Sequence, residues 1–177
     1  MTNRKELEPP LAMIWRRERV ERHVPPQDFV LRSTVDHDRF HQIQSAIGWE
    51  MREGQWEELS ARVLPGGMIF CEHAASGEAV GVACALVGDK ETTVELAWVA
   101  VVPHYQGRGL AAAICAEVIA VAHAAGFSEV TLTTRDDRLA ALKTYLKLGF
   151  EPVVDEASLD RWQSVLRILD WPGDFGA

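Results

Sequence analysis

The sequence lacks the features that mark membrane, secreted or nucleic-acid-binding proteins. No apolar run is long enough to span a bilayer, and residues Met1 to Glu8 are polar, without the apolar core of a signal peptide. Basic residues number 18 against 26 acidic ones, which gives a formal charge of −8 and a pI near 5.2. Sequence-independent binding of nucleic acid needs a basic face, so this charge argues against it.

Cysteine is also scarce. The three cysteines, Cys71, Cys84 and Cys115, lie in apolar runs without metal-ligand spacing. An odd number in such places predicts buried, reduced thiols in a cytoplasmic protein, and no metal site. Repeats and low-complexity runs are absent. The 177 residues, 47% of them apolar, are enough for one domain with a core of its own.

One stretch of the chain is more informative than the rest. Val94 to Val102 is rich in β-branched and aromatic residues and predicts a buried strand, which stops at Pro103 because proline has no N–H for a ladder. The two glycines of Gln106-Gly-Arg-Gly109 permit unusual φ values and leave no Cβ to block a ligand. Leu110 to His123 has apolar residues at helical spacing. The pattern predicts a strand, a sharp turn and a helix.

A turn of this kind aims the unpaired N–H groups of a helix N-terminus at one point, where the helix dipole is positive. It therefore predicts a site for a phosphate-like anion, although a glycine-rich turn also occurs as plain packing. Two known anion loops do not fit. The P-loop needs a Lys-Ser/Thr pair where this chain has Leu110-Ala111, and the dinucleotide fingerprint needs three spaced glycines after a first strand.

What remains is the pattern Gln-x-x-Gly-x-Ala from Gln106 to Ala111, after a strand that ends Val-x-Pro. It resembles the pyrophosphate loop of the GNAT-type N-acetyltransferases. A second segment, Leu139 to Phe150, resembles the Ala-x-x-x-Tyr-x-x-x-Gly-Phe helix that follows the fifth strand in that family. Two motifs in the right order identify the chain as a member, and the resemblance covers residues 28 to 153.

The predicted elements indicate an α/β fold with a GNAT-like mixed sheet. Its N-terminal meander is antiparallel, its central strands are parallel and splay around the cofactor, and helices flank it. Strands are expected at Phe29–Ser33, Met68–Cys71, Ala79–Val87, Val94–Val102, Val130–Thr133 and Phe150–Val153, and helices at 34–47, 54–64, 110–123, 136–146 and 159–169. The expected domains are an extension at 1–27, the acetyltransferase domain at 28–155, and a C-terminal amphipathic helix within 156–177 packed on it.

Particular residues are expected to begin and end these helices. Thr34 or Asp36 is predicted to cap the first helix, and Asp136 or Asp137 the fourth. Pro65-Gly66-Gly67 is expected to break the second helix.

The resemblance implies acetyl-CoA as the ligand, held mainly by main-chain groups. Strand residues would bond the pantetheine amides as an added strand does, and N–H groups of the loop would bind the pyrophosphate. Arg108 would add a charge-assisted contact. The implied cofactor-binding residues are Val99, Ala100, Val101, Gln106, Gly107, Arg108, Gly109, Leu110, Ala111 and Ala112.

Acetyl transfer to an amine poses two proton problems. An alkyl amine, with a pKa of about 10.4, must lose a proton, and the leaving thiol, with a pKa of about 8.5, must gain one. Tyr145 suits the acid role, since the family's tyrosine at this helix position reaches the cofactor sulfur. A core tyrosine beside Leu142 is the alternative. The oxyanion needs a donor such as a backbone N–H where the central strand splays.

Glu95 suits the role of the base. On simple alternation it shares a strand face with Ala97, Val99 and Val101, and burial near Trp98 would make it a better proton acceptor. Some GNAT-like enzymes carry their base glutamate at this distance before the loop. A glutamate on a solvated face, with water as the base, is the alternative.

The acceptor side is less well defined by the sequence. The two helices after the first strand lie where GNAT-like proteins usually place the acceptor pocket, so Trp49, Glu50, Trp56 and Glu57 are candidate contacts, with core or solvent-facing positions as the alternative. Arg138 stands where many relatives have a cofactor-contacting Asn. Small amines, amino acids, antibiotics and protein N-termini all remain open, and the resemblance leaves a homodimer open because dimers are common in the family.

The predicted function is a cytoplasmic N-acetyltransferase that moves acetyl from acetyl-CoA directly to an amine of a small molecule, a peptide N-terminus or a lysine. No covalent enzyme intermediate is expected because no cysteine lies in the motifs. The alternative is a non-catalytic acyl-CoA-binding module that senses the cofactor or serves a partner, against which Tyr145 argues.

Overall fold

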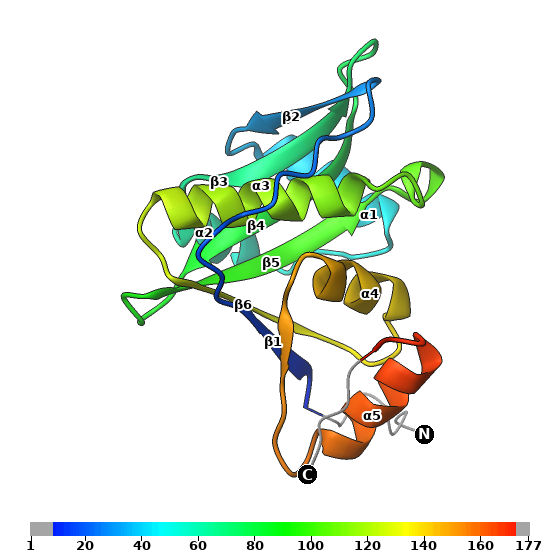
Figure 1. Ribbon diagram of the computed structural model, residues 1–177. Coiled ribbons are helices and arrows are strands. Elements are labelled where there is room, and N and C mark those ends of the chain that lie inside the picture. Colours follow the sequence, from blue (N-terminus) through cyan, green and yellow to red (C-terminus); the bar gives the residue numbers. More distant parts are fainter. Residues whose placement is uncertain (1–8, 173–177) are drawn as a thin grey trace. The chain divides into compact units, whose positions relative to one another are not determined.

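The computed structural model describes residues 9–172 and contains one mixed sheet with strand order β2-β3-β4-β5-β6-β1-β7 (Figure 1). The strands are β1 (Leu11–Trp15), β2 (Phe29–Ser33), β3 (Val63–His73), β4 (Ala79–Val87), β5 (Thr93–Val101), β6 (Glu129–Thr134) and β7 (Glu151–Val153). The helices are α1 (His37–Ala46), α2 (Gln55–Ser60), α3 (Leu110–Ala124), α4 (Leu139–Lys147) and α5 (Leu159–Ile168), with a 3₁₀ turn η2 (Pro103–Tyr105). The predicted α/β class is confirmed.

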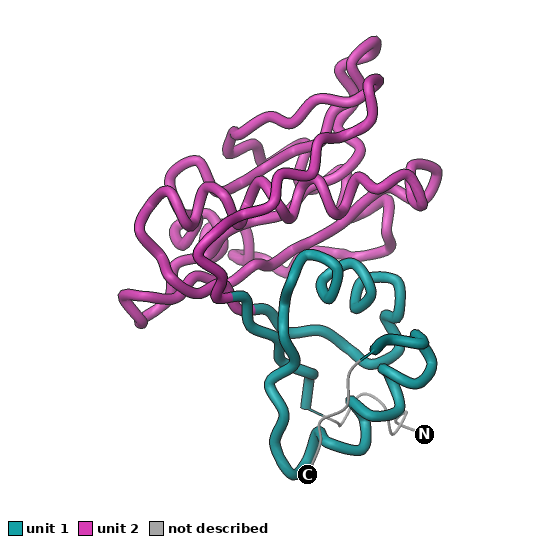
Figure 2. Tube along the Cα trace, in the orientation of Figure 1, with its two compact units in different colours: residues 1–15, 132–177 teal, residues 16–131 magenta. Residues whose placement is uncertain are grey.

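The chain divides into two compact units (Figure 2). Arg16–Thr131 forms the larger unit, and the described residues on either side of this range form the smaller one. Met1 to Glu8, where the sequence shows no signal-peptide core, lie outside the described residues, as do residues 173–177.

The larger unit holds the predicted antiparallel meander, in which β2, β3, β4 and β5 pair in chain order. The strands β5 and β6 then pair in parallel, as predicted, from Thr93↔Glu129 to Glu95↔Thr131. The helix α3 between them packs closely on β4, since a Cβ on Gly81 would lie 2.8 Å from Cδ1 of Ile114. Gly81 is therefore the residue that lets α3 approach this face of the sheet.

The other face of the meander is covered by α1 and α2. Phe40 and Ile43 of α1 are fully buried against β3 and β4. Their neighbours in this core cluster are Leu59, Met68, Phe70, Ala79, Val82, Cys84, Leu86 and Ala100. Because Gly81 faces α3 and Val82 belongs to the α1–α2 cluster, alternation along β4 separates the two layers.

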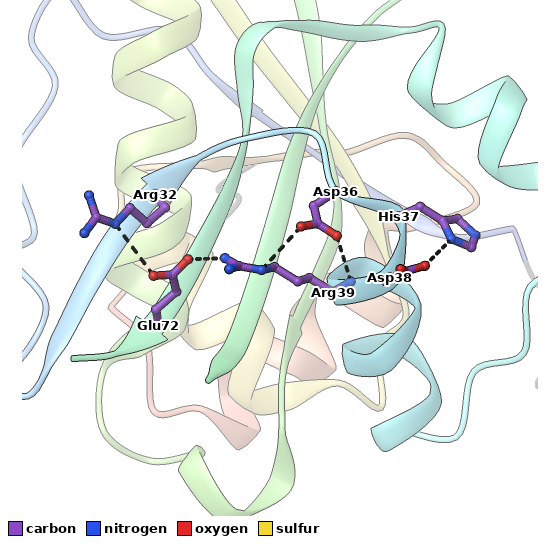
Figure 3. Close-up of polar contacts among 6 residues, drawn as sticks. All are labelled: Arg32, Asp36, His37, Asp38, Arg39 and Glu72. Carbon is purple, nitrogen blue, oxygen red and sulfur yellow. Dashed lines mark hydrogen bonds and ion pairs between the residues drawn. The ribbon is translucent and has the colours of Figure 1, made fainter. Parts of the chain in front are cut away.

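Ion pairs fix α1 to the sheet (Figure 3). Asp36 caps the helix, as predicted, by accepting a hydrogen bond from the Arg39 N–H at 3.1 Å. The Arg39 guanidinium donates to Glu72 on β3, and Arg32 on β2 lies 3.6 Å from the same carboxylate. The Glu72 side chain is only 11% exposed, so these two cations compensate its loss of hydration and hold α1 in register with β3.

The second predicted helix is too long. The helix α2 ends at Ser60, and β3 begins at Val63, inside the range expected to be helical. Pro65-Gly66-Gly67 does not separate two elements but forms an irregular part of β3, where the register shifts between Val63↔Leu86 and Met68↔Cys84. A Cβ on Gly67 would lie 2.8 Å from that of Ala85, so close packing explains this glycine.

The smaller unit contains a strand that was not predicted from the sequence. Residues Leu11–Trp15, expected to be a partly ordered piece of the extension at 1–27, form β1, which lies between β6 and β7 in the sheet. It pairs antiparallel with β7 from Ala12↔Val153 to Ile14↔Glu151. Its alternate residues Leu11, Met13 and Trp15 are buried.

The helices of the smaller unit match their predicted positions, but one cap does not. The predicted amphipathic helix α5 buries Trp162, Val165 and Leu166. Asp136 and Asp137 do not cap α4, whose N-cap residue is Arg138 with no side-chain cap bond. The carboxylate of Asp136 instead lies 3.2 Å from Nε of Arg161, and Asp137 pairs with Arg135.

Candidate active site

The turn after β5 is folded back on the strand by Gln106. Its Nε2 donates to the Val101 carbonyl at 2.9 Å, and its backbone N–H donates to the Pro103 carbonyl at 3.2 Å. The glutamine of the loop motif therefore stabilises the turn, and its contact with the cofactor stays a prediction. Behind it, Gly107 and Gly109 take left-handed φ values of 76° and 78°, which only glycine adopts without cost.

The loop presents a row of main-chain donors. The first hydrogen bond of α3 runs from Ala113 N–H to the Gly109 carbonyl at 3.2 Å. The N–H groups of residues 107 to 112 have no acceptor among the described residues, and Gly109 makes no side-chain cap bond. A Cβ on Gly107 or Gly109 would meet nothing within 4 Å. Open donors at the start of a 15-residue helix suit an anion.

Arg108 is held beside these donors by an aromatic neighbour. Its guanidinium carbon lies 5.4 Å from the centroid of the Tyr105 ring, a cation–π distance. The Tyr105 hydroxyl donates to Oε2 of Glu78 at 2.9 Å, a hydrogen bond that raises the pKa of Tyr105. Tyr105 is not among the residues predicted for the site, although an aromatic residue directly before the loop motif is a usable signal for a stacking partner of Arg108.

A β-bulge interrupts β5 at Trp98. Ala97 pairs with Cys84 and Ala100 with Val82, so Trp98 and Val99 together oppose one residue of β4. Trp98 has a φ of +57°, a costly conformation for a bulky residue that occurs mainly at functional sites.

The bulge changes which residues share the face of Glu95. Glu95 pairs with Leu86 of the α1–α2 cluster, and Ala100 belongs to the same cluster. Val101 instead pairs with Gly81, which faces α3. The predicted grouping of Glu95 with Val101 is therefore wrong, because strict alternation ends at the bulge.

Aromatic side chains cover the bulge on the α1–α2 side. The Trp98 ring packs at 5.6 Å from Phe40 and 6.0 Å from Trp49, and Trp56 lies 5.5 Å from Phe40. Two of the four candidate acceptor contacts thus belong to this aromatic cluster, Trp56 through Phe40 and Trp49 through Trp98, while Glu50 and Glu57 are exposed. Trp49 remains 45% exposed and gives the cluster an open edge.

Glu95 is less buried than expected. Its side chain is 40% exposed, and Nη2 of Arg62 lies 3.3 Å from its carboxylate. It lines a cavity of about 330 Å³ with Arg62 and Lys90, at the end of β5 opposite the anion loop. Glu95 is thus placed as a solvent-connected carboxylate with a cation beside it, and its role as a base stays a prediction.

Tyr145 belongs to the smaller unit, in α4. Its side chain is 7% exposed, and its ring meets Phe150 edge-on at 5.9 Å. Because it lies in the other unit from the anion loop, its role as proton donor to the cofactor sulfur stays a prediction. The same holds for Arg138.

The three cysteines are buried and unfit for nucleophilic attack. Burial raises the pKa of Cys71 to about 11 and that of Cys115 to about 12, and it raises the pKa of Cys84 further. Within residues 9–172, no three His, Cys, Asp or Glu side chains are grouped so that they could hold a metal ion. No helix in that range has the length and apolarity needed to cross a bilayer.

Comparison with known proteins identifies the family. The acetyltransferase (GNAT) family model matches residues 35–150, so the chain belongs to this family and the predicted membership is confirmed. The GCN5-related N-acetyltransferase from Sphaerobacter thermophilus superposes with a TM-score of 0.65 at 19% identity, over 82% of this chain and 50% of that one. The ribosomal-protein-S18-alanine N-acetyltransferase from Escherichia coli gives 0.61 at 22% identity, over 71% and 79%. These likenesses show the fold.

Among relatives by sequence are proteins named N-acetylaspartate synthetase. The one from Danio rerio is 36% identical over 89 residues, which are 50% of this chain and 32% of that protein. The one from Homo sapiens is 34% identical over 86 residues, which are 49% and 28%. The matched stretch therefore spans about a third of the length of these relatives.

Proposed function

We propose that this protein transfers acetyl from acetyl-CoA directly to an amine. The observation that carries the proposal is the row of unpaired N–H groups from Gly107 to Ala112, at the start of α3 and open to ligand. A diphosphate fits such donors, and the family to which the chain belongs is one of acetyltransferases. We extend the proposal to a cytoplasmic location and to the main-chain groups of Val99–Val101 as the contacts of the pantetheine arm.

The proposed reaction forms one bond and breaks one. The amine nitrogen attacks the thioester carbonyl carbon, the new C–N bond forms, and the C–S bond breaks. Glu95 takes one proton from the ammonium before attack and passes it to solvent, then takes the second proton that the nitrogen loses after attack. Tyr145 gives a proton to the departing sulfur and regains one from solvent. The developing oxyanion would accept a hydrogen bond from a backbone N–H of β5 near Trp98, where the strand that carries Glu95 is distorted.

The relatives suggest which acceptors to test first. Some are named for the synthesis of N-acetylaspartate, and one structural neighbour for an alanine of ribosomal protein S18. Aspartate and a peptide with an N-terminal alanine are therefore the first two acceptors for a screen, followed by polyamines, lysine side chains and aminoglycosides.

The experiment is a thiol-release assay with acetyl-CoA across this panel, combined with calorimetric titration of CoA. We expect micromolar binding and release of CoA with at least one amine. Absence of CoA binding would remove the proposal. Tight binding without thiol release for any amine would favour the alternative, a binding module that senses the cofactor.

The two tyrosines of the chain form a matched pair for the acid assignment. Tyr145→Phe is expected to lower kcat by about 100-fold while leaving the Kd for CoA nearly unchanged, because it removes only the proton donor. Tyr105→Phe removes a hydroxyl bonded to Glu78 and should leave kcat within about threefold. An unchanged rate in Tyr145→Phe would remove the acid assignment.

A further inference from the structure

The cavity beside Glu95 lies at the point where β5 and β6 part. Their parallel pairing ends at Glu95↔Thr131, and both residues line the cavity. Leu86, the β4 partner of Glu95, belongs to the α1–α2 core cluster, so the cavity lies on that face of the sheet. Ala100, beyond the bulge, belongs to the same cluster. The cavity therefore shares its face with the strand segment where acetyl transfer is proposed.

The charges around this cavity balance. Arg62 and Lys90 bring two cations, and Asp89 and Glu95 bring two carboxylates. These residues come from the loop before β3, the β4–β5 turn and β5 itself, all within the larger unit. Thr93 adds a hydroxyl that donates to Glu129 at 3.3 Å. A wall with both signs of charge is complementary to a ligand that carries both signs.

The two cations retain bonding capacity. Arg62 donates from Nη2 to the Glu95 carboxylate at 3.3 Å and from Nε to the Val87 carbonyl at 3.2 Å. Its Nη1 has no acceptor among the described residues. The ammonium of Lys90 makes no ion pair or hydrogen bond within residues 9–172. A carboxylate placed between them would receive charge-assisted hydrogen bonds from both.

We propose that the acceptor is an amine with a carboxylate close to it, an α-amino acid rather than a polyamine or a peptide N-terminus. Its carboxylate would bind Arg62 and Lys90, and its ammonium would face Glu95, to which it gives up the proton before attack. A peptide N-terminus presents an uncharged amide where this carboxylate would be. The inference rests on the proposed acetyl transfer and names the substrate class of that site.

The first test compares acceptors that differ only in the carboxylate. L-aspartate, L-alanine and L-serine are assayed for thiol release beside the corresponding α-amides at equal concentrations of the unprotonated amine. We expect kcat/KM for the free acids to exceed that for the amides by about tenfold or more. Equal values, or a preference for amides or polyamines, would overturn the substrate class while leaving acetyl transfer standing. No turnover with any amine would instead overturn the proposed function.

The second test removes the cation that has no internal partner. Lys90→Met is expected to raise KM for the free acid about threefold, and Lys90→Glu about tenfold, because an exposed charge contributes modestly and its reversal adds repulsion. The KM for the matched amide and for acetyl-CoA should not change. Arg167→Met, at an exposed position of α5, removes the same charge elsewhere and should leave all three constants unchanged.

Salt gives an independent readout of the same contact. Because exposed charges are screened, 0.5 M NaCl, an ionic strength at which the Debye length is about 4 Å, should raise KM for the acid in the unaltered protein and abolish the difference from Lys90→Met. A KM for the acid that is the same in Lys90→Glu and in the unaltered protein would overturn the role of Lys90. Thermal denaturation of each variant confirms that the fold is intact.

Discussion

The two ends of β5 offer a ligand different chemical groups. At the C-terminal end, the donors are mainly main-chain N–H groups of residues 107 to 112, with Gln106 shaping the turn and Arg108 beside it. At the N-terminal end, the groups around the cavity are side chains: Arg62, Lys90 and Glu95. Main-chain donors depend on conformation, whereas side-chain donors depend on residue identity. Substitutions should therefore affect the two ends in different ways.

This difference also fits the parts of the proposed reaction. A diphosphate is the same in every reaction that uses CoA, so a main-chain site at that end is independent of the acceptor. An acceptor varies from enzyme to enzyme, and a site made of side chains can change with it. The strand between the ends, distorted at Trp98, is where the two ligands would meet.

The largest effect is expected at the side-chain end. Glu95→Gln keeps the shape of the residue but removes the proton acceptor, so kcat should fall by about 100-fold and the rise of rate with pH should flatten. The KM for acetyl-CoA should stay the same. Glu91→Gln, on the exposed β4–β5 turn, is the control for the loss of one negative charge. An identical pH profile in Glu95→Gln would show that water or another group is the base.

The next effect tests the main-chain end. Gly109→Ala and Gly126→Ala place a Cβ at the two ends of α3, both at positive φ and both into open space. Each should lower the free energy of unfolding by about 1–2 kcal/mol. Only Gly109→Ala should raise the Kd for CoA, by about tenfold, because it disturbs the row of N–H donors. If both variants bind CoA equally well in calorimetry, the loop is not the diphosphate site.

A smaller effect is expected where a side chain supports the main-chain end. Tyr105→Leu removes the ring under Arg108 and the hydrogen bond to Glu78. The Kd for CoA should rise about threefold, since both contacts are exposed and each contributes modestly. Tyr105→Phe keeps the ring, so its Kd for CoA should lie between those of the unaltered protein and Tyr105→Leu. Equal affinities of all three would mean that Arg108 needs no support.

The smallest effect, none at all, is expected from thiol reagents. The raised pKa values keep Cys71, Cys84 and Cys115 protonated well above pH 8, and each is buried, so iodoacetamide at pH 8 should label none of them in the folded protein. Activity should survive the treatment, as direct transfer requires. Mass spectrometry of the treated protein checks this, and loss of activity with one label would point to a covalent intermediate.

Much of the larger unit could be predicted from the sequence. The strands β2 and β4 were predicted to the residue, because each is an apolar run bounded by charged or turn-forming residues. The anion loop could be predicted from the spacing of Gly107 and Gly109 directly before an apolar helix. The helix predicted at 54–64 is too long because Pro65–Gly67 was expected to end it. These residues instead form an irregular segment of β3, and the helix ends before that strand begins.

Other features depend on contacts that the sequence does not reveal. The strand β1 is five residues long and is followed by an irregular segment, so its extended form comes from pairing beside β7. The bulge at Trp98 cannot be recognised within an apolar run of residues. It places Val101 on the opposite face of the sheet from the one predicted. Arg62 and Lys90 join Glu95 only because a loop and a hairpin turn meet at one end of β5.

The placement of β1 has a practical consequence for anyone who trims this protein. Leu11–Trp15 is an interior strand, so an expressed fragment that starts after it would leave the edges of its neighbours bare and prone to aggregate. The same vacancy could accept a synthetic peptide of those five residues, added as a separate chain in the manner of strand complementation. The unit that carries Tyr145 would then assemble only when the peptide is supplied, so acetyl transfer that uses this proposed proton donor would depend on the added peptide.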